Sequence, residues 1–119
     1  MILDLYTKAK ALSDAYPFDR PIGVHMFLKH RDNLRESCYL HGGVDVLNML
    51  IDFEAIEAAT PLTEKQREIL EMYYRQGYTQ KEISEILGMT QQVVCEHVAR
   101  AVVKLARSYA DLMGGVEID

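Results

Sequence analysis

Residues 79–105 have the sequence TQKEISEILGMTQQVVCEHVARAVVKL, in which helix-start and helix-stop signals lie close together. Thr79 is followed three positions later by Glu82, which is the spacing of a capping box. Gly88 provides a residue that adopts the left-handed backbone at which many helices end. Thr90 is then placed to cap a second helix almost immediately. The stretch therefore predicts two helices joined by a very short connection.

The apolar spacing sets the bounds of these helices at 80–87 and at 91 to about 113. A connection this short forces the second helix across the first, so Ser84 must be small where they approach each other. The side chains expected to fill the space between the helices are Ile83, Leu87, Met89, Val94 and Val98, and Ile86 is expected as a further core contact of the shorter helix. This is the sequence form of an all-α helix-turn-helix unit.

A helix-turn-helix holds the amino end of its second helix outward, where side chains can contact base edges in the major groove of duplex DNA. The predicted base-contacting residues are Thr90, Gln91, Gln92, Cys95 and Glu96. Predicted phosphate contacts at the start of the shorter helix, through free backbone N–H groups and the helix dipole, are Thr79, Gln80 and Lys81. Further predicted phosphate contacts are Arg100, Lys104 and Arg107. Alternatively, these three residues and Glu96 form a solvent-exposed helix face with salt bridges.

A third helix is expected just upstream, because Thr63 and Gln66 form a second capping-box pattern and Gly77 follows the apolar run. Pro61 disfavours helical geometry at the residue before it, so a boundary falls there. We therefore expect an amino-terminal helical region over 1–60, a helix-turn-helix domain over 61–113, and a short flexible tail over 114–119.

The amino-terminal region reads as a helical extension whose topology the pattern leaves open. Helices are expected over Ile2–Ala15, Ile22–Ser37 and Asp45–Ala58, with Asp45 as the cap of the last one. Residues 38–40 are compatible with a short extended piece. The acids expected to face solvent on the last helix are Asp52, Glu54 and Glu57.

Residues 62–105 resemble the fourth region of sigma-70-family RNA polymerase sigma factors. The resemblance lies in the LTEKQREIL helix, the tyrosine-rich link that ends in GYT, the KEISEILG helix, the Thr-initiated helix after it and the final RAVVKL. It implies a helix-turn-helix of three to four helices, binding to double-stranded DNA and regulation of transcription. LuxR-type response-regulator domains share part of the pattern, but Tyr73-Tyr74 and Gln91-Gln92 favour the sigma-like branch.

The recognition helix departs from the sigma-factor pattern at its start. Sigma factors usually carry several arginines there, whereas this chain has Gln91-Gln92-Val93-Val94-Cys95-Glu96. Glutamine suits adenine and glutamate can accept from cytosine, so a different target sequence is expected. Short sigma-like proteins of this organisation resemble regulators encoded by bacteriophages and prophages. Two further functions stay open: an adaptor that binds RNA polymerase without contacting DNA, and a recognition subunit of a phage DNA-packaging machine.

Composition limits the partners and the class of protein. The 119 residues carry a net charge of −5, which argues against bulk electrostatic coating of nucleic acid. From Leu62 to Tyr109 there are seven bases and six acids, so one copy is expected to bind DNA weakly. Dimerisation or tethering to RNA polymerase would compensate. The apolar end of the long helix packs either on the amino-terminal region or in a homodimer, through Val102, Val103, Leu105, Ala106, Tyr109, Ala110, Leu112 and Met113.

Catalytic and metal-binding patterns have little support. Phosphate loops, nucleophile elbows and zinc-protease motifs are missing from the sequence, so we expect a protein that is not an enzyme and needs no cofactor. His25, His30, Cys38 and His41 are the only grouping with metal-ligand chemistry, but their spacing is irregular and no metal is expected. With no signal-peptide pattern and no long apolar run, we expect a cytoplasmic protein without a membrane span.

Overall fold

The computed structural model describes residues 16–41 and 43–113. This part of the chain consists of five α-helices and one π-helical turn, without a β-strand, which confirms the all-α prediction. The expected helix over Ile2–Ala15 and the expected tail over 114–119 lie outside the described residues. None of the helices in the described part combines the length and the apolar content that crossing a membrane requires.

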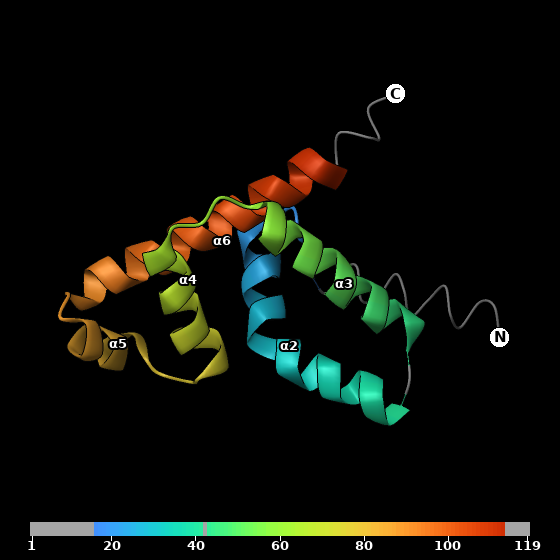
Figure 1. The fold of residues 1–119 in the computed structure, drawn as a ribbon, viewed down its shortest axis with the longest axis horizontal. Coiled ribbons are helices and arrows are strands. Elements are labelled where there is room, and N and C mark those ends of the chain that lie inside the picture. The colour runs from blue at the N-terminus through green and yellow to red at the C-terminus, as the bar shows by residue number, and fades with distance from the viewer. Residues whose placement is uncertain (1–15, 42, 114–119) are drawn as a thin grey trace.

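The long helix α6 (Gln91–Met113) is the axis of the fold (Figure 1). Helices α4 (Glu64–Leu70) and α5 (Gln80–Leu87) pack beside its first half. Helices α2 (Pro21–His41) and α3 (Val44–Ala59) run side by side and contact α6 further along. One helix thus serves both the helix-turn-helix unit and the amino-terminal region.

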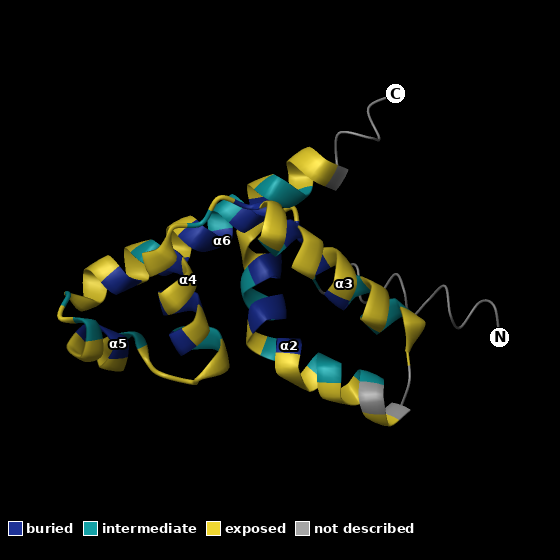
Figure 2. Ribbon diagram, in the orientation of Figure 1, coloured by how far each residue is buried: buried dark blue, intermediate teal, exposed yellow. Residues whose placement is uncertain are grey.

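The buried side chains form one cluster that spans both parts of the chain. Figure 2 marks the buried positions along the ribbon of both parts. An aromatic group lies at its centre in the amino-terminal region, where the Phe18 ring is 4.9 Å from Phe27, 5.2 Å from Phe53 and 5.5 Å from Tyr109. Burying each such ring contributes about 1.5–3 kcal/mol. Because Tyr109 belongs to α6, the late turns of the long helix pack on the amino-terminal region, and Leu112 is half-exposed.

The helix ends of the amino-terminal region differ from the predicted ones. Helix α2 continues to His41, so the extended piece considered for residues 38–40 is wrong. The next helix, α3, begins after Gly43, which has a φ of 142° that glycine adopts far more readily than other residues. No side chain caps the start of α3. Asp45 lies inside the first turn, so its predicted role as the cap is also wrong.

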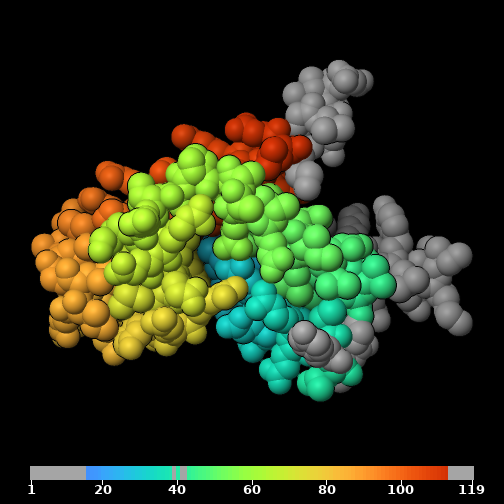
Figure 3. Space-filling view, in the orientation of Figure 1, coloured from blue at the N-terminus to red at the C-terminus, as the bar shows by residue number. Residues whose placement is uncertain are grey.

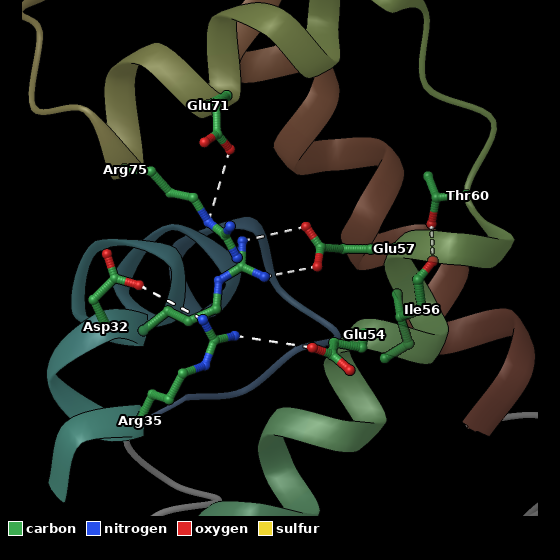
Figure 4. A network of polar contacts seen from close by, with 9 residues as sticks. Asp32, Arg35, Glu54, Ile56, Glu57, Thr60, Glu71 and Arg75 are labelled. Carbon is green, nitrogen blue, oxygen red and sulfur yellow. Dashed lines mark hydrogen bonds and ion pairs between the residues drawn. The ribbon is translucent and has the colours of Figure 1, made fainter.

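Glu57 does not face solvent freely, contrary to the prediction, because it pairs with a buried arginine of α2 (Figure 4). The Arg31 guanidinium donates to both Glu57 carboxylate oxygens, at 2.7 and 3.2 Å, and lies 5.3 Å from the centre of the Phe53 ring. Bidentate geometry and a ring face are what a guanidinium needs when water is excluded. Asp52 and Glu54 are exposed, as expected.

The Thr63–Gln66 capping box is present, with both of its hydrogen bonds at 3.1 Å. The helix that follows changes to a π-helical turn, η1 (Glu71–Arg75), which the sequence pattern did not predict. The Tyr74 hydroxyl in this turn lies 2.7 Å from His25 Nδ1. The helix-turn-helix unit is therefore tied to α2 by a polar contact as well as by apolar packing.

Candidate nucleic-acid interface

The first helix of the unit, α5, has the bounds that the sequence predicted. The Thr79 hydroxyl accepts from the Glu82 backbone N–H at 3.1 Å, and the Glu82 carboxylate accepts from the Thr79 backbone N–H at 3.0 Å. Gly88 ends the helix with φ 69° and ψ 36°, and Met89 N–H bonds to the Ser84 carbonyl at 3.0 Å. The Gly88 N–H bonds to the same carbonyl, and these hydrogen bonds together with the left-handed glycine produce the sharp connection.

Fewer side chains of α5 pack against α6 than the sequence predicted. Ile83 and Val94 are fully buried and Val98 is nearly so, which fixes the crossing of the two helices. Ile86, in contrast, is 56% exposed, so its predicted place in the core is wrong. The apolar face of α5 therefore consists mainly of Ile83 and Leu87.

The start of α6 lies at one end of the molecule, where it packs beside α5 (Figure 3). All five predicted base-contacting residues are exposed there: Thr90, Gln91, Gln92, Cys95 and Glu96. Thr90 also caps the helix, because its hydroxyl oxygen accepts from the Val93 N–H at 3.1 Å. The remaining four side chains are open to a ligand.

Val93 was not among the predicted contacts, yet it is 37% exposed among those residues. An apolar side chain at this place can contact a thymine methyl group in the major groove. Its position within the first turn of the second helix was the signal available in the sequence. We add Val93 to the candidate base-contacting residues.

At the start of α5, the backbone N–H of Thr79 is not free, contrary to the prediction, because the Glu82 carboxylate occupies it. That carboxylate also places a negative charge where a phosphate would approach. Lys81 is exposed and Gln80 half-buried in the same turn. Lysine therefore offers the stronger attraction for a phosphate at this place.

The three basic residues of α6 line a shallow groove of about 480 Å³ beside α4, together with Gln66, Ala99 and Val103. Arg100 and Arg107 are exposed. Lys104 is half-buried, because its Nζ donates to Gln66 Oε1 at 3.1 Å and to the Pro61 carbonyl at 3.4 Å. In the part of the chain that the structure describes, no ion pair joins Glu96 to Arg100.

The histidines considered as metal ligands have other contacts. His25 bonds to Tyr74, and His30 Nδ1 lies 3.1 Å from the Tyr16 hydroxyl. Burial, followed by the charges of Lys29 and His30, lowers the pKa of His25 below its usual 6.5. Among the described residues, no three His, Cys, Asp or Glu side chains gather to hold a metal ion.

Comparison with known proteins concerns the same region. Residues 61–107 match the family model described as Sigma-70, region 4. Over 40 residues the chain is 55% identical to a UPF0122 protein of Caldanaerobacter subterraneus subsp. tengcongensis and 52% identical to UPF0122 proteins of Thermoanaerobacter sp. and Thermoanaerobacter pseudethanolicus. Each match covers 34% of this chain and 34% of the relative, so it spans about a third of those proteins. Among solved structures, none matches the chain significantly.

Proposed function

We propose, from the premise that residues 61–107 form a helix-turn-helix unit of the sigma-70 region 4 type, that this chain is a sequence-specific DNA-binding regulator of transcription. In this proposal the start of α6 enters the major groove, and basic side chains of α5 and α6 contact the phosphates on either side. The protein acts by binding and has no catalytic role.

The observation that carries the proposal is the combination of exposure and support at the start of α6. Gln91, Gln92, Cys95 and Glu96 are exposed, while Val94 and Val98 on the other face are buried. Side chains that contact nucleobases bind best from a rigid helix, because ordering a mobile segment or side chain on binding costs free energy. Glutamine can donate to and accept from adenine in one bidentate contact, which discriminates by about 1–3 kcal/mol.

The charges predict weak binding by a single copy. Lys81, Arg100 and Arg107 are exposed, whereas Lys104 already bonds to Gln66. Three phosphate contacts give a salt slope of about −2.7, or a loss of about 40-fold in affinity between 50 and 200 mM salt. We propose that a second copy on a neighbouring half-site, or contact with RNA polymerase, supplies the remaining affinity. Encoding by a phage or prophage also belongs to this proposal.

The test is selection of duplex fragments from a random pool, followed by fluorescence anisotropy with the selected sequence. Gln91→Ala with Gln92→Ala should reduce the ratio of specific to non-specific affinity by at least about 30-fold, since each contact contributes about 1–3 kcal/mol, and leave the salt slope unchanged. Asn33→Ala with Asn48→Ala, two exposed amides of α2 and α3, is the matched control. Unchanged specificity in the glutamine variant would contradict base contact by α6.

A polymerase-binding adaptor is the second candidate function. The near balance of seven bases and six acids over residues 62–109 favours it, because so small an excess of cations attracts DNA only weakly. An adaptor predicts no selected sequence even at low salt, together with co-purification with RNA polymerase. A DNA-packaging subunit, in contrast, predicts a selected sequence without polymerase. The selection therefore separates the adaptor from the two DNA-binding candidates, and co-purification with RNA polymerase favours the regulator over the packaging subunit.

A further inference from the structure

Helix α3 is apolar on two faces, although only one of them packs in the core. Leu50, Phe53 and Ile56 are buried on the inner face. On the outer face, Val44 is 71%, Leu47 46% and Ile51 53% exposed. These three residues follow a spacing of three and four, which places them in one row. An apolar row of this kind on a surface helix is typical of an interaction site.

The row borders a groove between α2 and α3, on the side-by-side pair seen in Figure 1. The groove has a volume of about 360 Å³ and is lined by Arg35, Cys38, Leu47, Leu50, Ile51 and Glu54. The exposed side chains of Leu47 and Ile51 therefore form part of a concave surface. This shape accepts the apolar face of a helix, whose anchors repeat every three to four residues.

The surroundings of the groove are acidic. Residues 32–59 contain six carboxylates and a single arginine, Arg35, and one of the six carboxylates, Glu57, is paired with Arg31. Arg35 lies 4.0 Å from Asp32 and 3.9 Å from Glu54, so its charge is already balanced (Figure 4). The side chains of Asp32 and Glu54 are nevertheless 63% and 65% exposed, and Asp52 and Glu36 are exposed as well. A ligand of this surface meets an excess of negative charge.

We propose that this groove binds an amphipathic helix of a partner protein, with apolar anchors on one face and Lys or Arg beside them. A second copy of this chain would bring the carboxylates of α3 against themselves. Residues 1–15 carry two acids and two bases, so their side chains bring no net positive charge to this surface. The same charge keeps DNA away, which makes the site independent of the proposed DNA-binding function.

The test uses the full chain labelled with ¹⁵N and a synthetic helix about three turns long, with leucine on one face and lysine on its flanks. A second peptide has glutamate in place of every lysine. We expect the lysine peptide to shift amide signals of Cys38, Leu47 and Ile51, and to bind more weakly as salt rises. Equal binding of the glutamate peptide, or shifts confined to other helices, would overturn the proposal.

Matched variants separate the groove from non-specific attraction. Leu47→Gln with Ile51→Gln keeps the charge and should weaken the lysine peptide by at least about ten-fold. Ile86→Gln, an exposed isoleucine of α5, should leave its affinity unchanged. Two other results would overturn the proposal: a wild-type dimer in sedimentation that the double variant abolishes, and nuclear Overhauser contacts between residues 1–15 and Leu47 in the free chain.

Discussion

Gly23 is the position at which one added methyl group should damage the fold most. It lies buried in the first turn of α2, against the chain that enters the helix. A Cβ at Gly23 would lie within 2.7 Å of three backbone atoms of Pro17, and a backbone cannot rotate away as a side chain can. Phe18, the next residue, is 7% exposed and packs on Phe27 and Tyr109. Any shift of Pro17 therefore moves the aromatic core.

The expected cost of Gly23→Ala combines these two effects. Overpacking costs about 1–3 kcal/mol, and partial loss of the Phe18 contacts adds about 1–2 kcal/mol. The sum of about 3 kcal/mol is a large part of the stability of a small protein, which is about 5–15 kcal/mol. Urea unfolding followed by circular dichroism measures it as a lower midpoint.

Gly88→Ala is the control, because it tests the backbone without the collision. Nothing lies within 4 Å of a Cβ at Gly88, but its φ of 69° disfavours alanine by about 1 kcal/mol. Gly88→Asn should recover part of that cost, since asparagine tolerates the left-handed region, whereas Gly23→Asn should recover nothing. If Gly23→Ala costs no more than Gly88→Ala, the close approach of α2 to Pro17 is wrong.

Three further predictions concern polar contacts. Arg31→Met should lower the free energy of unfolding by about 3 kcal/mol, because it leaves Glu57 without its partner. Arg31→Met combined with Glu57→Leu should recover most of that loss in a double-mutant cycle, and equal losses in the single and double variants would contradict a coupled pair. The pKa of His25 is lowered in the folded chain, so the unfolded chain binds the extra proton and the free energy of unfolding should fall as pH drops below about 6.5. His25→Gln should reduce that slope in urea titrations between pH 5 and 7, and an unchanged slope would assign it elsewhere. Thr79→Ala should cost about 1 kcal/mol and Thr79→Ser much less, because serine keeps the hydroxyl that caps α5 and loses only the methyl group. Thermal unfolding measures both costs, and equal losses would exclude the capping box as the cause.

The sequence predicted the parts of the fold that depend on neighbours in the chain. The bounds of α5 follow from Thr79, Glu82 and Gly88, which lie within ten residues of one another and act through local hydrogen bonds and backbone preference. The end of α2 depended instead on whether residues 38–40 continue a helix or extend. Both are compatible with the local pattern, and in the structure α2 ends at His41 before α3 begins at Val44.

The candidate interface shows the same division. Exposure at the start of α6 follows from the helical period, so Gln91 and Gln92 are where the sequence placed them. The bond from Lys104 to Gln66 joins residues 38 positions apart and depends on how α4 crosses α6, which periodicity does not encode. For the same reason Ile86 looks like a core residue on α5 alone, yet no neighbouring helix covers it within the described chain.

The two proposed surfaces lie on different parts of one framework. Helix α6 has 23 residues and is about 34 Å long. Its first two turns carry the candidate base contacts, and its later turns pack on the amino-terminal region through Tyr109 and Phe18. The acidic groove belongs to α2 and α3, and α5 lies towards the opposite end of the molecule (Figure 1). Opposite charge preferences keep DNA from the groove and a basic helix from the cations of α6. The two proposals together predict that DNA and a partner helix bind at the same time, which is the arrangement a regulator needs if it is to bring another protein to a chosen sequence.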